Sequence, residues 1–91
     1  MKVENLVNSR GNEVINQFII TQSGEQTFQS YETTVAKRSL INGKIILDIK
    51  ALDYSPTTSK HLATFLGYEN AKDLRTAIKN KEKDFTFKDL N

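Results

Sequence analysis

The stretch Asp53-Tyr54-Ser55-Pro56-Thr57-Thr58-Ser59-Lys60-His61-Leu62-Ala63-Thr64-Phe65-Leu66-Gly67 divides the chain into two parts with different hydrophobic periodicity. Ser55 is a favourable N-cap residue, and Pro56 fits the first helical position, where no backbone N–H is needed. Three apolar residues then follow at helical spacing: Leu62, Phe65 and Leu66. Gly67 can adopt the left-handed conformation that ends a helix. The stretch therefore predicts a helix from Pro56 to Leu66.

The start of this helix also carries three hydroxyl side chains, those of Thr57, Thr58 and Ser59. They lie in the first turn, beside backbone N–H groups that have no partner within the helix. An anion could bind at such a place. The alternative is that these hydroxyls only cap the helix, which is the usual role of such residues.

Upstream of the helix the sequence predicts strands. Val14–Gln22 contains the apolar run Phe18-Ile19-Ile20, which is typical of a strand that is covered on both faces and lies inside a sheet. Ser23-Gly24 suits a tight turn into a second strand, Glu25–Tyr31. Residues 1–12 leave a helical turn and a short strand open, since their few apolar residues fit either.

The dipeptide Asn42-Gly43 is a strong local signal for a hairpin. It stands between the segments Val35–Ile41 and Lys44–Ile49, and both of its residues tolerate the positive φ of a type I′ turn. In the second segment apolar residues alternate with Lys44 and Asp48, which indicates a strand with one covered face. The upstream half thus predicts an antiparallel meander of three to four strands.

Downstream, Asn70 can cap a second helix, Ala71 to about Asn80. Phe85 and Phe87 then alternate with polar residues, as in a short strand. The predicted fold is α+β, with a three- to four-stranded meander followed by two helices and a short C-terminal strand. Its 91 residues favour a single domain, 1–91.

Composition narrows the function classes. The formal net charge is +2, with 37% hydrophobic and 26% charged residues, as in an ordinary globular domain. Cysteine is absent, which excludes disulfides and thiolate chemistry and suits a reducing cytoplasm. No apolar run has membrane-spanning length, and residues 1–5 lack the apolar core of a signal peptide. We therefore expect a cytoplasmic protein without membrane contacts.

Catalytic and metal sites are not indicated. His61 is the single histidine, and the carboxylates have no ligand spacing, so we expect no metal ion. His61, Asp53 and Ser55 can be combined into a catalytic set, but no motif supports it. No Gly-rich phosphate loop is present. The sequence predicts a protein that is not an enzyme and has no cofactor.

Nucleic-acid binding is one hypothesis for the basic residues. Lys72, Arg75 and Lys79 lie at i, i+3 and i+7 on the second predicted helix, where they could contact phosphates or form an ordinary solvated face. Three further cations near the Asn42-Gly43 turn could extend this surface: Lys37, Arg38 and Lys44. Aromatic residues could stack on bases or belong to the core: Phe28, Tyr31 and Tyr54.

Two resemblances add to this picture. Residues 59–71 resemble part of a helix-turn-helix, although Asp73 stands where a buried residue is expected in the second helix. Within that part, Leu66-Gly67-Tyr68-Glu69-Asn70-Ala71, followed by a basic helix, is similar to the amino-terminal domain of phage antirepressors of the BRO type. This local likeness favours DNA binding.

The chain as a whole resembles a small family of uncharacterised proteins of phages and mobile elements of low-GC bacteria. The matching pieces are Gly11-Asn12, Asn16-Gln17-Phe18-Ile19-Ile20, Phe28-Gln29-Ser30-Tyr31, Leu47-Asp48, Asp53-Tyr54-Ser55, Thr57-Thr58, Lys60 and Phe65-Leu66-Gly67. This resemblance implies an origin and no activity, and Leu52 stands where an aromatic residue is expected. It favours a binding protein that modulates a host or defence protein in the cytoplasm of the host cell. The alternative is a DNA-binding accessory or regulatory protein.

Several of these matching residues are polar or amphipathic, which a core alone would not require: Gln29, Ser30, Tyr31, Asp53, Tyr54 and Thr58. If the upstream hairpin folds back on the first helix, they could form a shared binding patch. The alternative is a buried hydrogen-bond network that holds the sheet on the helix. An exposed strand edge could also pair with a second copy of the chain, so a homodimer is a further expectation.

Overall fold

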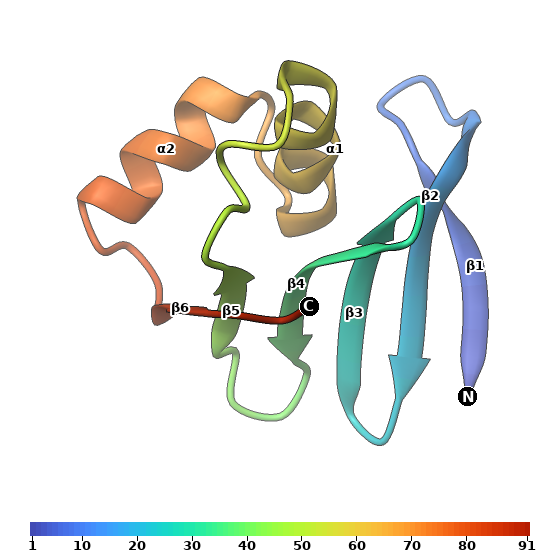
Figure 1. Cartoon of the computed structure of the whole chain (residues 1–91), viewed down its shortest axis with the longest axis horizontal. Coiled ribbons are helices and arrows are strands. Elements are labelled where there is room, and N and C mark those ends of the chain that lie inside the picture. The colour runs from blue at the N-terminus through green and yellow to red at the C-terminus, as the bar shows by residue number, and fades with distance from the viewer.

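A single six-stranded sheet, in the order β1-β2-β3-β4-β5-β6, is the framework of the computed structural model, which describes residues 1–91 (Figure 1). The elements are β1 (Lys2–Val7), β2 (Glu13–Gln22), β3 (Glu25–Ser30), β4 (Thr33–Ser39), β5 (Ile45–Asp48), α1 (Pro56–Leu66), α2 (Ala71–Lys79) and β6 (Phe85–Lys88). Neighbouring strands from β1 to β5 are antiparallel, and β6 is parallel to β5. The two helices between β5 and β6 form the crossover that a parallel pair requires.

The α+β class, the two helices and the short C-terminal strand are confirmed, but a meander of three to four strands is wrong. The meander has five strands, because residues Lys2–Val7 form β1 instead of a helical turn. Pairing with β2 decides this, since Val3 lies opposite Ile20 and Asn5 lies opposite Phe18. A strand whose conformation depends on its neighbour is hard to recognise from its own few apolar residues.

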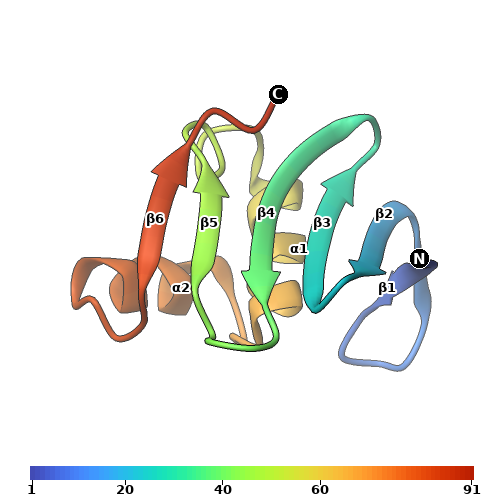
Figure 2. The same ribbon diagram turned by 90° about the horizontal axis from the view of Figure 1, so that it is seen from below.

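Both helices lie on one face of the sheet, and the other face is open (Figure 2). The run Phe18-Ile19-Ile20 is therefore not covered on both faces as predicted. Ile19 packs against the core, whereas Phe18 and Ile20 are half-buried on the open face. Neither helix has the length and apolar composition of a membrane-spanning segment.

The helix ends follow the sequence prediction closely. The Ser55 hydroxyl accepts a hydrogen bond from the Thr58 backbone N–H at 3.0 Å, and Gly67 ends α1 at φ 86°. The Asn70 side chain accepts one from the Asp73 N–H at 2.8 Å at the start of α2. Each cap satisfies an N–H that the helix leaves without a partner.

The turn chemistry differs from the prediction. The loop at Asn42-Gly43 joins β4 to β5, but only Gly43 has positive φ, so it is not a type I′ turn. The Asn42 side chain instead accepts a hydrogen bond from the Lys44 N–H at 3.0 Å, which stabilises a longer loop. The two-residue turn with positive φ at both positions is Ser23-Gly24, at φ 50° and 76°.

The core lies between the sheet and α1. Phe28 of β3 is fully buried and stacks on Phe65 of α1, with ring centroids 5.5 Å apart. The Arg38 guanidinium also lies over the Phe65 ring, 4.6 Å from its centre, and donates a hydrogen bond to the Phe65 carbonyl oxygen at 3.1 Å. Apolar stacking and one internal cation therefore hold α1 on the sheet.

Replacing Phe28 by alanine should remove this contact. The expected loss in the free energy of unfolding is about 4 kcal/mol, the usual cost of emptying a buried phenylalanine site, which is a large part of the stability of a small domain. Denaturant unfolding followed by circular dichroism measures this loss. Ile15→Ala, at a position that is 78% exposed, is the matched control and should change the stability little. Equal losses for both variants would contradict this packing.

Candidate functional site

The connection between β3 and β4 presents an aromatic side chain on a strained backbone. Tyr31 has φ 54°, in the left-handed region that residues with a Cβ rarely adopt. Its N–H donates a hydrogen bond to the Asn16 carbonyl oxygen at 2.7 Å, and its own carbonyl oxygen accepts one from the Gln29 side chain at 2.7 Å. The side chain held in this way is 63% exposed. A costly conformation that displays an apolar ring to solvent is typical of a recognition site.

A small pocket adjoins Tyr31 at the end of the sheet where β3 meets the start of α1. It has a volume of about 130 Å³. Six residues line it, and all except Val35 carry a hydroxyl group: Ser30, Tyr31, Thr33, Val35, Tyr54 and Thr58. We call this the hydroxyl pocket. Its wall comes from β3, β4, α1 and the segment before α1, so the fold of the whole domain forms it.

A buried carboxylate is hydrogen-bonded to Tyr54, one of the residues that line the pocket. Asp48, at the end of β5, is 2% exposed. Its Oδ2 accepts hydrogen bonds from the Tyr54 hydroxyl and from the Lys50 N–H at 3.1 Å. Its Oδ1 accepts them from the Leu90 N–H at 2.9 Å and the Asn91 side-chain amide at 3.2 Å. These donors provide the compensation that a buried charge requires.

Asn91 connects this carboxylate to the neighbouring strand. Its side-chain oxygen accepts a hydrogen bond from the Thr34 N–H at 2.9 Å, and its side-chain nitrogen donates one to the Thr34 carbonyl oxygen at 2.9 Å. The amide thus pairs with the backbone of β4 as another strand would. We call Asp48, Tyr54, Leu90, Asn91 and Thr34 the Asp48 network.

The network perturbs two ionisable groups. Burial by itself would raise the pKa of Asp48, but the hydrogen bonds outweigh it and hold the pKa below the ordinary value of 3.8. Burial, together with the hydrogen bond and charge of Asp48, raises the pKa of Tyr54 to about 12. At neutral pH the carboxylate is therefore ionised. The Tyr54 hydroxyl keeps its proton and donates a hydrogen bond to the carboxylate.

The predicted polar set is brought together only in part. Ser30, Tyr31, Tyr54 and Thr58 line the hydroxyl pocket, and Gln29 supports Tyr31 from outside. Asp53 instead lies in a groove of about 290 Å³ between α1 and α2. The two alternatives, a surface patch and an internal network, are combined at Tyr54, because its ring lines the pocket while its hydroxyl binds Asp48.

The hydroxyls at the start of α1 differ in their surroundings. Ser55 donates its hydroxyl proton to the Thr58 hydroxyl oxygen at 3.0 Å and caps the Thr58 N–H, and Pro56 has no N–H to offer. Ser59 is buried, and Thr57 is exposed. The cap is therefore Ser55, whereas the Thr58 hydroxyl only accepts a hydrogen bond from it and the buried Ser59 hydroxyl has no hydrogen-bond partner.

The predicted cationic residues do not form one surface. Arg38 points inward, where it donates hydrogen bonds to Phe65 and to the Gln26 side-chain oxygen at 2.6 Å. Lys37 lies on the open face of the sheet, 3.8 Å from Glu25, and Lys44 lies in the exposed loop after β4.

On the helix side, Lys72, Arg75 and Lys79 are exposed on α2. The Arg75 guanidinium donates a hydrogen bond to the Leu52 carbonyl oxygen at 2.7 Å. In the part that resembles a helix-turn-helix, Leu62, Ala63 and Leu66 are buried, but Asp73 is exposed. The second helix therefore departs from that motif at Asp73, as the sequence indicates.

The catalytic set drawn from the sequence is not assembled. His61 faces a groove of about 510 Å³ between α1 and the β1–β2 loop, which Arg10 and Lys60 also line. Asp53 and Ser55 line the separate groove beside α2. Burial and the charge of Lys60 lower the pKa of His61.

Three important residues were not identified from the sequence. Asp48 was expected on a solvent-facing side of its strand, because strand alternation places it opposite the buried Ile45 and Leu47. Asn91 and Asn16 gave no local signal, because their partners are distant in the sequence. The matching pieces Asn16-Gln17 and Leu47-Asp48 did contain two of these residues.

The fold and site define a small α+β domain with an exposed, strained tyrosine beside a hydroxyl-lined pocket. The chain belongs to a family described as a family of unknown function (DUF8033), whose model matches residues 1–86. Neither the comparison with curated proteins nor the comparison with solved structures finds a match.

The Asp48 network should give the protein a specific acid sensitivity. Because the pKa of Asp48 is lower in the folded chain than in the unfolded chain, its contribution to stability is fully present above the unfolded value. This contribution is lost as the pH falls through the folded value. At neutral pH, Asp48→Asn should lower the free energy of unfolding by roughly 2 kcal/mol, since the donors lose a charged acceptor.

The measurement is urea unfolding of both proteins at several pH values between neutral and strongly acidic. The difference in the free energy of unfolding between the two proteins should shrink as the pH falls below the ordinary carboxylate pKa, and it should disappear when Asp48 is protonated. Asp53→Asn, at an exposed carboxylate, serves as the control. A difference that is independent of pH would show that the charge of Asp48 contributes nothing.

Proposed function

We propose that the protein is a non-enzymatic binding protein of phage or mobile-element origin that modulates a host or defence protein in the host cytoplasm. Its contact surface is centred on Tyr31 and Tyr54. The origin is supported by the resemblance of the short pieces between Gly11 and Gly67. The surface is supported by the geometry of Tyr31, which is the observation that carries the proposal.

Tyrosine at such a place suits protein recognition. Its ring provides apolar contact area with few rotatable bonds, and its hydroxyl can form a hydrogen bond at the rim of an interface. The backbone hydrogen bonds to Asn16 and Gln29 fix the position of Tyr31 before any partner arrives. Such preorganisation lowers the entropy that binding would otherwise cost.

The size of the hydroxyl pocket favours a macromolecular partner. Its volume of about 130 Å³ is below the roughly 300–1,000 Å³ of typical small-molecule sites. It has room for one side chain of a partner, and its hydroxyl groups offer hydrogen bonds to a polar one. The partner's remaining contacts would then fall on the exposed ring of Tyr31.

DNA binding is a second candidate, supported by the exposed Lys72, Arg75 and Lys79 on α2. It has weaker support than protein binding, because Arg38 is used inside the domain and Lys37 lies on the opposite face of the sheet from α2. A duplex lying along α2 could not reach Lys37.

Tyr31→Gly tests the protein-binding surface. Glycine adopts positive φ without the penalty of about 1 kcal/mol that a Cβ brings, and this gain is offset by the entropy glycine loses on folding. The variant should therefore fold as stably as the original protein. In affinity purification from a lysate of a low-GC bacterium, we expect a stoichiometric partner with the original chain and with the control Ile15→Ala. The partner should be absent with Tyr31→Gly. Retention of the partner by Tyr31→Gly would refute the proposed surface.

The DNA-binding candidate predicts a different response. The affinity for duplex DNA should fall steeply with salt, and the slope of log affinity against log salt should become less steep by about 2–3 units when Lys72, Arg75 and Lys79 are all changed to alanine. Fluorescence anisotropy with a labelled duplex measures both quantities. Tyr31→Gly should leave this binding unchanged. Binding that is insensitive to salt would exclude phosphate contacts through α2.

A further inference from the structure

The edge of the sheet formed by β1 has no partner within the chain. β1 pairs with β2 on one side only, and no other element of the chain lies beyond it (Figure 1). Lys2, Val3 and Glu4 are all exposed on this strand. Its ladder with β2 is regular from Lys2 to Asn5 and becomes irregular only between Asn5 and Val7. A regular edge of this kind leaves backbone N–H and C=O groups free for another strand.

A second copy of the same edge can pair in only a few ways. When two β1 strands pair antiparallel about a two-fold axis, one residue lies opposite its own copy, because directly opposite residues share a face of the sheet. An axis at Lys2 or at Glu4 places two like charges opposite each other, which is destabilising. An axis at Asn5 falls where the ladder becomes irregular and sets Glu4 opposite the buried Leu6.

An axis at Val3 has none of these faults. Lys2 then lies opposite Glu4 of the second copy, and Glu4 opposite its Lys2, so that two pairs of opposite charge form. Val3, which is 55% exposed, meets its own copy on the open face beside the half-buried Ile20. Of the registers in the regular part of β1, this is the one with complementary charges.

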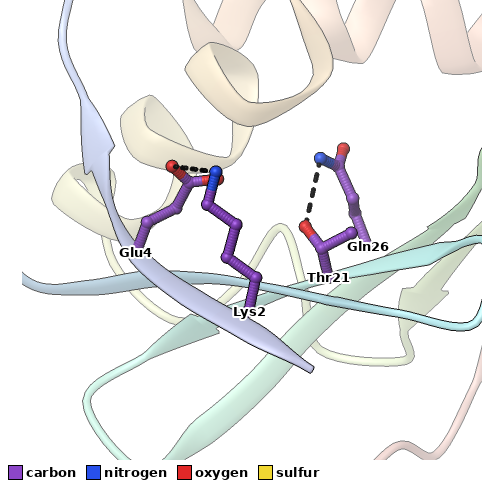
Figure 3. Close-up of polar contacts among 4 residues, drawn as sticks. All are labelled: Lys2, Glu4, Thr21 and Gln26. Carbon is purple, nitrogen blue, oxygen red and sulfur yellow. Dashed lines mark hydrogen bonds and ion pairs between the residues drawn. The ribbon is translucent and has the colours of Figure 1, made fainter.

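The two charged side chains are already placed on the required face. Lys2 and Glu4 stand on the same side of β1 and form an ion pair of 3.8 Å, on the side where Thr21 and Gln26 also point (Figure 3). The Lys2 side chain is 73% exposed. An exposed pair of this kind contributes little within one chain, so exchanging partners with a second copy costs little.

We infer that β1 is a homodimer interface, in which two copies join into a continuous twelve-stranded sheet with Lys2–Glu4 pairs on both sides of a two-fold axis at Val3. The axis is perpendicular to the sheet, so the helices of both copies lie on the same face. The inference does not depend on the Tyr31 surface, which lies at the end of β3.

Charge reversal tests the register. In sedimentation equilibrium of the full chain, we expect a monomer–dimer equilibrium that Lys2→Glu weakens about tenfold or more, since it replaces two attractive cross-strand pairs by repulsive ones. Glu4→Lys should have the same effect. The double variant Lys2→Glu with Glu4→Lys restores opposite charges and should recover the affinity of the original chain.

A cysteine placed at the axis gives an independent readout, because the chain has no cysteine of its own. Val3→Cys lies opposite its own copy and should form a covalent dimer rapidly under mild oxidation. Ile15→Cys, at a still more exposed position on β2, is the control and should cross-link much more slowly.

Three results would overturn the inference. The first is an original chain that stays monomeric at the highest concentration its solubility allows. The second is a double charge variant that dimerises as weakly as the single variants. The third is equal cross-linking of Val3→Cys and Ile15→Cys. Circular dichroism of each variant confirms that the exposed substitutions leave the monomer folded, so a loss of dimer reports on the interface alone.

Discussion

The ionised carboxylate of Asp48 constrains the whole end of the sheet that carries the candidate site. A buried charge is tolerated only when its oxygen atoms are hydrogen-bonded, and here the donors come from Tyr54, Lys50, Leu90 and Asn91. These donors belong to two separate parts of the chain, the segment between β5 and α1 and the residues after β6. Their convergence fixes the segment before α1 and the residues after β6 against the ends of the central strands.

This constraint also determines how the hydroxyl pocket is formed. Tyr54 can line the pocket because its hydroxyl is anchored on Asp48, and Thr34 is held beside Thr33 of the wall by the side chain of Asn91. On the other wall, the hydrogen bonds to Asn16 and Gln29 hold Tyr31 at positive φ. Rigid support on both sides is what allows a strained residue to persist on an exposed surface.

Local sequence signals predicted the helices well and the site poorly. Ser55, Pro56, Gly67 and Asn70 act through bonds within a few residues, so their effects are visible in the sequence. Two of the donors to Asp48, Leu90 and Asn91, lie instead 42 and 43 residues away along the chain, and no period in the sequence reveals such contacts.

The errors in the sheet have both long-range and local causes. β1 is a strand because β2 pairs with it, whereas the few apolar residues of β1 itself give no strong local pattern. Asn42-Gly43 has the composition of a type I′ turn, but local hydrogen bonds of Ser39 and Asn42 stabilise a longer loop. Arg38 was interpreted as a surface cation, although its contact with Phe65 is internal.

Taken together, the two proposed surfaces have a geometric consequence. β1 and β3 run in the same direction, because two antiparallel steps separate them, so Tyr31 lies at the end of the sheet where β1 also ends. In a dimer with antiparallel β1 strands, the two Tyr31 surfaces would therefore point to opposite ends of the joined sheet. One compact partner could not reach both, and no gain from two-site binding to a single molecule is expected. Such a dimer would hold two partner molecules apart, or bridge neighbouring copies of a partner that is itself an assembly.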